Sequence, residues 1–408
     1  MDRKRKRSTT FQFSVIILVL TLGLVQAGVS KTAPPAIRGL GPQDALLVID
    51  PSGRTVLSHN PDQLMVPAST LKLLTSLAAL HYLGATYRFH TDFFMDRQNT
   101  LGIKGYGDPL LVSEVIATIA HRLAEKRLPP VNGILLDESY FAGSMTIPGV
   151  SVTTNPYDAP VGALCANFNT VFFTHVNGQL TSAEEQTPLL PMVLNRIRRS
   201  GLQEGRIILS HTHDEAPLYA GNLFRYFLDQ EGVTVRGAVQ MTANGLPEEN
   251  LIYRHASPYD LAQIIKRLLE YSNNFTANQL LLAMGAQCYG PPATLDKGVR
   301  ALKAFARDVI GIQKGVLVEG SGISRHNRLS VRDMAAVLAH FRPHAQLMSH
   351  KGQEYYKTGT LKGIRTRAGY IEVKPGNLYR FALFRNRSGR TTAPVMRQIQ
   401  RYLSNHQQ

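Results

Sequence analysis

Cysteine is scarce in this chain of 408 residues, which contains only Cys165 and Cys288. A Cys/His zinc finger is therefore absent, and the sequence leaves one disulfide bond and two free thiols as equally open states of the pair. Internal repeats and low-complexity tracts are also absent. The chain is nevertheless long enough for two or three domains with a sizeable core.

Long apolar runs are rare as well. The one near the N-terminus covers Phe13 to Val25, 13 residues, whereas a helix that spans a bilayer needs roughly 20. It follows the basic residues 3–7 and precedes small residues that suit a cleavage site. We therefore predict a secretory signal over residues 1–27, a mature N-terminus at Gly28 and export to the periplasm. An uncleaved anchor is the alternative, and a lipid anchor has no cysteine directly after the run.

Acidic residues are in deficit, because 29 Asp and Glu stand against 45 Lys and Arg, a formal net charge of +16. Removal of residues 1–27 takes away five basic residues and one acidic residue and leaves about +12. Nucleic acid is not an expected partner, since the protein is exported and has no basic box interleaved with aromatic residues. An anionic polymer such as the cell wall, or peripheral contact with a membrane surface, suits this charge better.

The remaining chain alternates between strand-like and helix-like patterns. Residues 45–50 and 55–57 predict a β-hairpin, and a helix begins near Ser69, directly after Pro67. From about residue 87 to 213, short apolar runs are broken by Gly and Pro, with helices near 112–126 and 189–200, which predicts an insertion. Beyond it we expect helices and then strands. The expected helices cover 219–232, 258–271, 277–288, 296–310, 331–340 and 394–403, and the expected strands cover 354–357, 368–373 and 378–384.

Ser69 and Lys72 lie three positions apart, in the sequence Ser-Thr-Leu-Lys, and therefore share one face of the predicted helix. A serine hydroxyl is a poor nucleophile at neutral pH and needs a base within hydrogen-bond reach. Burial and a second cation, Lys357, would lower the pKa of Lys72 enough for it to act as that base. An isolated Ser-x-x-Lys is usually a surface pair, but the apolar helix that follows this one favours a buried site.

Ser272 and Asn274 belong to the sequence Ser-Asn-Asn, where the helix over 258–271 ends. In an extended loop, alternate side chains face the same way, so both could reach one site. The hydroxyl could pass a proton between Lys72 and a leaving amine, and the amide could hold the backbone of a substrate. Taken alone, the cluster would be an ordinary helix terminator.

Lys357, Thr358, Gly359 and Thr360 follow a short aromatic strand. The lysine could supply positive charge for a substrate carboxylate, and both threonines could donate hydrogen bonds to it. The glycine would let a substrate strand approach the sheet edge, and the backbone N–H groups of Thr360 and Ser69 would form an oxyanion hole. Alone, the motif would be only a charged edge strand.

Two other clusters give weaker evidence for a functional site. His211-Thr212-His213-Asp214 resembles a fragment of a metal site, but no His-Glu-x-x-His or similar ligand pair accompanies it, so no metal is expected. Gly105-Tyr106-Gly107-Asp108 is a turn and not a phosphate loop, because no Gly-Lys-Ser/Thr follows. No cofactor is expected.

The three ordered motifs resemble those of penicillin-binding proteins and class A β-lactamases. Three further blocks make the chain similar to the serine-type D-alanyl-D-alanine carboxypeptidases/endopeptidases of the class C low-molecular-mass penicillin-binding proteins, the penicillin-binding protein 4 type. These blocks are Gly107-Asp108-Pro109, residues 255–258, and the sequence Glu-Gly-Ser-Gly-Ile-Ser-Arg-His-Asn at 319–327.

The resemblance implies a mixed α/β (α+β) fold with a β-lactamase/transpeptidase-like catalytic domain. We expect this domain to comprise residues 28–88 and 214–408, with an inserted domain over residues 89–213. It also implies Ser69, Lys72, Ser272 and Asn274 as catalytic residues and 357–360 as the substrate-binding strand. Peptidoglycan peptides would be the substrate and β-lactam antibiotics covalent inhibitors, while the sequence leaves the oligomeric state open.

Two other function classes are alternatives to a DD-peptidase. A serine β-lactamase needs a deacylating base, but no Glu-x-x-x-Asn loop of class A follows the second motif, and the Tyr-x-Asn of class C is replaced by Ser-Asn-Asn. A catalytically silent wall-binding protein is the third possibility. Against it, the nucleophile, base and anchor positions are all filled.

Overall fold

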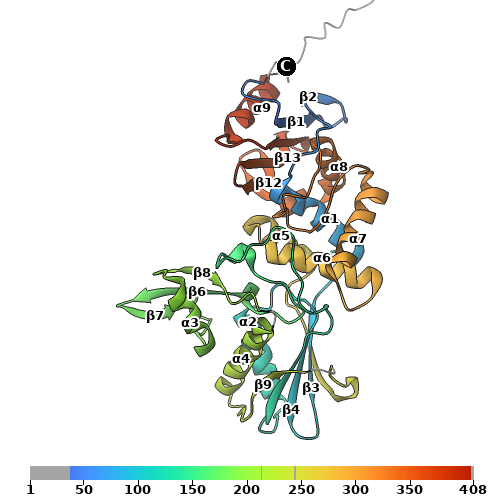
Figure 1. The fold of residues 1–408 in the computed structure, drawn as a ribbon. Helices are drawn as coiled ribbons and strands as arrows, with labels where there is room; N and C mark the ends of the chain where they lie inside the picture. Colours follow the sequence, from blue (N-terminus) through green and yellow to red (C-terminus); the bar gives the residue numbers. More distant parts are fainter. Residues whose placement is uncertain (1–36, 213, 243–244, 406–408) are drawn as a thin grey trace, which may run out of the picture. The chain divides into compact units, whose positions relative to one another are not determined.

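The computed structural model describes residues 37–212, 214–242 and 245–405 (Figure 1). The predicted signal segment, residues 1–27, lies outside these ranges. The chain from Ile37 onward forms one compact unit, in which three β-sheets are packed with helices. Within the described ranges, no helix is both long and apolar enough to cross a membrane.

A six-stranded antiparallel sheet joins the two ends of the described chain. In spatial order its strands are β11 (Ser349–Lys351), β12 (Glu354–Leu361), β13 (Ile364–Lys374), β14 (Asn377–Arg385), β1 (Asp44–Ile49) and β2 (Thr55–His59). After Asp44, β1 is an unbroken apolar run because both of its faces are covered. A buried ion pair between Asp44 and Arg385 (3.0 Å) holds β1 to the end of β14.

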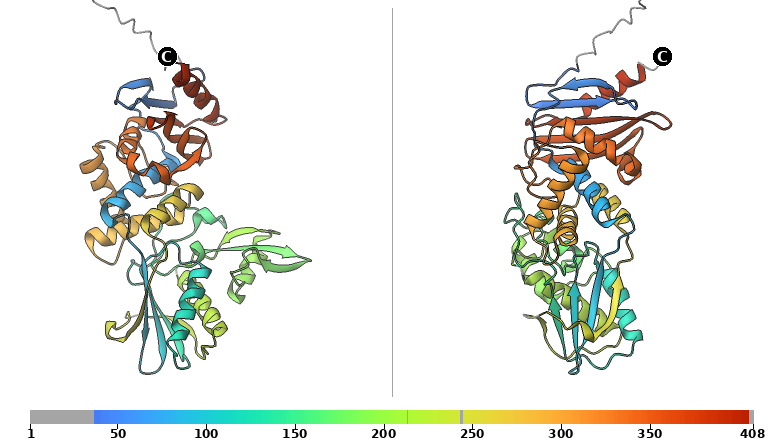
Figure 2. Two further views of the ribbon diagram at one scale, coloured as in Figure 1. Left: turned by 180° about the vertical axis from the view of Figure 1, so that it is seen from behind. Right: turned by 90° about the vertical axis from the view of Figure 1, so that its right-hand side faces the viewer.

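Five helices share one apolar core with the inner face of this sheet (Figure 2). They are α1 (Lys72–Leu83), α5 (Leu261–Tyr271), α6 (Asn274–Tyr289), α7 (Leu295–Phe305) and α8 (Val331–Phe341). α1 contacts the other four, which explains why it has almost no polar face. The last helix, α9 (Ala393–Asn405), covers the opposite face of the sheet through Val395, Ile399 and Leu403.

A second, five-stranded sheet lies between α1 and α5 in the sequence. Its order is β10 (Leu251–Ala256), β3 (His90–Met95), β4 (Thr100–Gly105), β5 (Gly133–Asp137) and β9 (Val239–Met241). The β4–β5 and β5–β9 pairs are parallel, and the others are antiparallel. α2 (Ser113–Glu125) and α4 (Glu215–Gln230) bury their apolar sides in the core of this sheet.

A third sheet has three strands in the order β7 (Gln179–Ser182), β6 (Thr170–Val176) and β8 (Gly205–Ile208). It is accompanied by α3 (Pro191–Ser200). Val171 and Phe173 of β6 and Ile197 of α3 join the same core as α2 and α4. The small sheet therefore belongs with the five-stranded sheet in packing.

The five-stranded sheet extends past residue 213, where the sequence predicted the insertion to end. α4, β9 and β10 were expected in the catalytic domain, yet β9 and β10 form the two outer strands of this sheet and α4 packs on it. Short strands that pair with partners far upstream carry little periodic signal, which explains the difference. We propose that the insertion runs from about residue 89 to about residue 257.

The other expected elements are confirmed, with ends that differ by a few residues. The predicted 296–310 helix, for example, divides into α7 and a π-helical turn over Ala306–Ile310. Cys165 and Cys288, left open as a pair or as free thiols, are both free.

Candidate active site

Ser69 lies in a tight turn at the start of the central helix. Pro67 precedes a 3₁₀ helix, η1 (Ala68–Leu71), which continues directly into α1 at Lys72. This confirms the predicted position of Ser69 at a helix start. Ala68 is fully buried and has a left-handed φ of 46°, which an L-residue retains only where its surroundings hold it.

Two glycines enclose this turn. A Cβ atom on Gly322 would lie 1.9 Å from the carbonyl oxygen of Ala68, and one on Gly359 would lie 2.8 Å from the backbone nitrogen of Ser69. A larger residue at either position would displace the backbone. Gly359 therefore lets β12 run against the Ser69 turn, and its predicted second role, admitting a substrate strand, stays a prediction.

The amine of Lys72 lies at the centre of the site, and its side chain is fully buried. The Lys72 Nζ atom is 3.0 Å from Ser69 Oγ, 2.7 Å from Asn274 Oδ1 and 2.7 Å from the carbonyl oxygen of Ser321. The structure thus brings the first and second motifs together. It adds the backbone carbonyl of Ser321, which belongs to none of the three motifs.

These three neighbours constrain where the protons lie. The oxygens of Asn274 and Ser321 can only accept hydrogen bonds, whereas the Ser69 hydroxyl can also donate one. A neutral amine has two N–H groups and one lone pair, so it satisfies all three neighbours with its lone pair toward Ser69. Burial and the charge of Lys357 both hold the pKa of Lys72 well below its usual value, and Glu319 opposes them.

The second motif forms the junction between α5 and α6. Ser272 ends α5 in a left-handed conformation (φ 58°), and Asn273 caps α6 by accepting a hydrogen bond from the Thr276 backbone N–H at 2.9 Å. The expected extended loop is therefore wrong, because one left-handed residue and one cap suffice to join the helices. Asn274 reaches Lys72, while Ser272 lines the same cavity as Ser69 and makes no hydrogen bond to Lys72 in the described chain.

The third motif lies on β12, at a free edge as predicted. β11 pairs only with residues 354–356 of β12, so in the described structure the residues from Lys357 to Thr360 have no strand partner on that side. Thr360 lines the cavity beside Ser69. Thr358 is exposed and is not one of the cavity-lining residues.

Lys357 is buried, with 4% of its surface exposed. Burial lowers the pKa of its amine to about 8. Lys357 Nζ donates a hydrogen bond to the carbonyl oxygen of Thr358 at 3.2 Å. Near neutral pH Lys357 is therefore largely protonated and acts on Lys72 as a positive charge.

Glu319 organises the loop that faces Lys72, a role that the motif analysis did not identify. Its carboxylate is fully buried and accepts hydrogen bonds from the backbone N–H and hydroxyl of Ser321 (both 2.6 Å), the N–H of Gly322 (2.7 Å) and the amide of Asn327 (2.6 Å). An acidic residue directly before Gly-Ser-Gly was the available signal, since such turns present several N–H groups to one anion.

A cavity of about 790 Å³ opens at Ser69. Its polar lining includes the catalytic candidates and several cationic side chains. The lining residues are Ser69, Gly149, Ser151, Tyr157, Asp158, Ser272, Asn274, Ile323, Ser324, Arg325, His326, Thr360, Leu361, Lys362 and Arg365. The positive charges of Arg325, Lys362 and Arg365 make the cavity suitable for an anionic ligand.

The described residues of the histidine fragment, 211, 212 and 214, do not line this cavity. His211 Nε2 is 2.8 Å from the carbonyl oxygen of Thr153, which can only accept, and His213 lies outside the described residues. Among the described residues, no group of three or more His, Cys, Asp or Glu side chains could hold a metal ion. Independence from metal stays a prediction.

Known proteins resemble this chain over most of its length. The model of the D-Ala-D-Ala carboxypeptidase 3 (S13) family matches residues 44–191 and 200–350. A D-alanyl-D-alanine carboxypeptidase from Actinomadura sp. (strain R39) is 26% identical over 425 residues, covering 84% of this chain and 77% of the relative. The D-alanyl-D-alanine carboxypeptidase DacB from Haemophilus influenzae is 24% identical over 398 residues, covering 81% of this chain and 82% of the relative.

Solved structures with the same fold include penicillin binding protein 4 (dacB) from Haemophilus influenzae, with a TM-score of 0.73 at 20% identity, covering 90% of this chain and 97% of that one. A penicillin G-acylated predatory endopeptidase from Bdellovibrio bacteriovorus has a TM-score of 0.53 at 17% identity, covering 88% and 91%. The chain thus has the predicted transpeptidase-like fold with an inserted domain.

Proposed function

Because this chain belongs to the D-Ala-D-Ala carboxypeptidase 3 (S13) family, and is therefore a hydrolase of the peptidase class, we propose how it acts. It is an exported D-alanyl-D-alanine carboxypeptidase, DD-endopeptidase or both, and trims peptidoglycan peptides through a serine acyl-enzyme. One observation carries the proposal: a fully buried lysine amine lies 3.0 Å from the hydroxyl of Ser69.

In the acylation step, the neutral amine of Lys72 takes the proton of Ser69 as Oγ attacks the carbonyl carbon of the penultimate D-Ala. The backbone N–H groups of Ser69 and Thr360 stabilise the resulting oxyanion. The proton then passes from Lys72, through the hydroxyl of Ser272, to the leaving amine. Water afterwards attacks the acyl-enzyme, with Lys72 again as the base, and releases the trimmed peptide and free Ser69.

Substrate recognition rests on the exposed edge of β12. Lys357 and the hydroxyls of Thr358 and Thr360 bind the terminal carboxylate of the peptide, and Asn274 holds its backbone. Of these three residues, Thr360 lines the cavity at Ser69, whereas Lys357 and Thr358 do not. The cationic rim of the cavity adds attraction for the anionic peptide.

Covalent labelling tests the acyl-enzyme. Fluorescent penicillin should label the purified protein at Ser69, a reaction that the penicillin G-acylated neighbour supports. Ser69→Ala and Lys72→Ala should both abolish labelling, whereas Ser388→Ala, at an exposed serine, should label like wild type. Labelling that persists in Ser69→Ala contradicts the mechanism. A label lost within seconds through turnover would instead indicate a β-lactamase.

Digestion of purified muropeptides, followed by mass spectrometry, distinguishes the two peptidase activities. Loss of one D-Ala indicates a carboxypeptidase, and cleavage of cross-linked dimers indicates an endopeptidase. We expect activity to survive a chelator, because neither base nor nucleophile requires a metal. N-terminal sequencing of the exported protein should find Gly28 first, and recovery of residues before Ala27 would contradict cleavage.

A further inference from the structure

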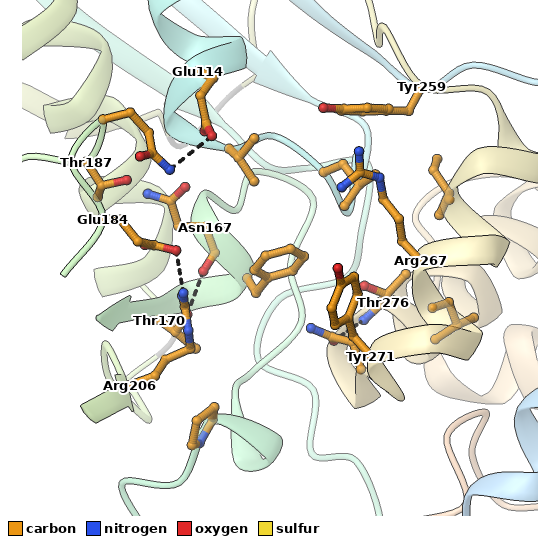
Figure 3. A pocket seen from close by; sticks show the side chains of 18 residues that line it. Glu114, Asn167, Thr170, Glu184, Thr187, Arg206, Tyr259, Arg267, Tyr271 and Thr276 are labelled. Atoms are coloured by element: carbon orange, nitrogen blue, oxygen red, sulfur yellow. Dashed lines mark hydrogen bonds and ion pairs between the residues drawn. The ribbon is translucent and has the colours of Figure 1, made fainter. Parts of the chain in front are cut away.

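A second cavity, of about 460 Å³, lies beside the junction of α5 and α6 (Figure 3). Tyr271 and Asn273 line it, whereas the alternate residues Ser272 and Asn274 line the catalytic cavity. Likewise, Pro156 lines the second cavity and Tyr157 lines the catalytic cavity. Asn274 Nδ2 donates a hydrogen bond to the Tyr157 carbonyl oxygen at 3.3 Å. The two cavities therefore share one wall.

One side of the second cavity is aromatic and cationic. Tyr271 is 71% exposed, and the guanidinium carbon of Arg267 lies 4.7 Å from the centre of the Tyr259 ring. Within the described chain Arg267 makes no hydrogen bond or ion pair, so its N–H groups are available to a ligand. Figure 3 shows these three side chains together, across the cavity from Glu184 and Arg206.

The opposite side, from the inserted part, is polar. Glu184 forms an ion pair with Arg206, which also donates a hydrogen bond to Thr170 Oγ1 at 3.0 Å. Gln186 donates one to Glu114 at 3.0 Å. The two carboxylates and two guanidinium groups around the cavity balance in charge, so the site suits a neutral ligand with many polar groups.

The backbone of residues 167–169, beside the cavity, is held in a strained conformation. Asn167, Phe168 and Asn169 all have left-handed φ angles (49°, 59° and 54°), and for a bulky residue such as Phe168 this is a genuine outlier. Asn167 holds the turn with two 2.9 Å hydrogen bonds to Ser113. Strain of this kind is typical of preorganised ligand sites, and Phe168 lines this one.

We infer that the second cavity binds N-acetylated sugar units of the glycan strand to which the substrate peptide is attached. A pyranose ring has apolar faces that stack on tyrosine and a rim of hydroxyl and acetamido groups that suits carboxylates, amides and an unpaired guanidinium. The shared wall puts such a unit next to the catalytic cavity. This inference rests on the proposed function, because it assigns a second part of the same substrate to this site.

The test uses the full mature protein and a neutral oligosaccharide of N-acetylglucosamine as the glycan probe, measured by isothermal titration calorimetry. We expect saturable binding by wild type, and affinities about five- to tenfold weaker for Arg267→Ala and for Gln186→Ala on the opposite side. The matched control is Arg300→Ala. Arg300 stacks in the same way on Tyr289, with its guanidinium carbon 4.5 Å from the ring centre, but lines neither cavity.

A second readout compares D-Ala release from pentapeptides on glycan strands with release from free pentapeptide. The kcat/KM for glycan-attached pentapeptide, divided by the kcat/KM for free pentapeptide, should fall in Arg267→Ala and match wild type in Arg300→Ala. Absence of glycan binding by wild type, or an unchanged affinity in both cavity variants, overturns the inference. Competition of free pentapeptide for the glycan also overturns it, because the cavity would then be a peptide site. Penicillin labelling of wild type tests the proposed function separately.

Discussion

Glu319 and Lys72 are connected through a single residue, Ser321. The Glu319 carboxylate accepts hydrogen bonds from the backbone N–H and the hydroxyl of Ser321, both at 2.6 Å, and the Ser321 carbonyl oxygen accepts one from Lys72 at 2.7 Å. The same carboxylate opposes the lowering of the Lys72 pKa by burial and Lys357. Glu319 thus acts on the Lys72 amine both by position and by charge.

We expect Glu319→Gln to move the acid limb of the pH–rate profile for penicillin acylation to lower pH. Loss of the buried negative charge lowers the pKa of Lys72 further, so the neutral amine exists at lower pH. The maximal rate should fall because the loop loses its anion, and the free energy of unfolding should drop by about 1.5–3 kcal/mol. Glu249→Gln, at an exposed position, is the control. An acid limb displaced to higher pH would contradict the role of charge.

In Lys357→Ala we expect the acid limb of the pH–rate profile for acylation to move to higher pH. Removal of this cation raises the pKa of Lys72, so acylation should slow at neutral pH and partly recover at alkaline pH. Loss of the charge-assisted contact with the carboxylate, about 1.5–3 kcal/mol, should lower kcat/KM for peptides roughly 10- to 150-fold. Acylation rates from pH 6 to 10 measure the first effect, with Lys351→Ala on the neighbouring strand as the control. Parallel profiles would mean that Lys357 only binds substrate.

Binding of the peptide carboxylate should itself depend on pH. Lys357 is protonated below a pKa of about 8 and loses its charge above it. KM for a D-Ala-D-Ala peptide should therefore rise as the pH increases through 8, and in Lys357→Ala this rise should be absent. Steady-state kinetics between pH 6.5 and 9.5 measure KM for both proteins. A rise of equal size in both proteins would assign the titration to another group.

Asn274→Asp should slow acylation at neutral pH about tenfold or more, because a carboxylate 2.7 Å from the Lys72 amine favours its protonated form. The matched control is Asn273→Asp. That change introduces the same charge one residue away, keeps an acceptable helix cap and does not contact Lys72. Stopped-flow acylation rates for the two variants compare them directly, and equal rates would show that the charge at position 274 does not reach the base.

The Ser69 turn should not tolerate a side chain at Gly322. Both Gly322 and Gly376 have left-handed φ angles, +83° and +76°, but only at Gly322 would a Cβ atom collide with the chain. Gly376→Ala should therefore cost about 1–2 kcal/mol of stability and leave acylation unchanged. Gly322→Ala should cost about 2–5 kcal/mol and reduce acylation. Chemical denaturation and penicillin labelling test both, and normal labelling of Gly322→Ala would refute the close contact.

The sequence predicted the helix start at Ser69, the nearby Lys72 amine and the edge strand because each lies in a local pattern that can be recognised without knowledge of the fold. Ser69 lies two residues after a proline at the start of an apolar helix, and Lys357 directly follows two tyrosines within a strand. The transpeptidase-like fold followed from the resemblance that these motifs carry.

Relations between distant segments were harder to predict. β9 has only three residues and pairs in parallel with β5, about a hundred residues upstream, so no alternation marks it as part of that sheet. The acceptor role of Ser321 belongs to a backbone carbonyl, and side-chain identity does not reveal which carbonyl a loop will present. The second cavity likewise depends on how the inserted part packs against α5.

Lys72 has partners 202 and 249 residues further along the chain, and β1 pairs with β14 near the other end of the described chain as well as with the adjacent β2. Contacts across such separations form late in folding, since a long loop must close before they become favourable. If Ser69 is acylated as proposed, a molecule still searching for these contacts lacks a base and takes up no antibiotic. The ratio of penicillin label to total protein then measures the natively folded fraction of a preparation, including a pool still maturing after export.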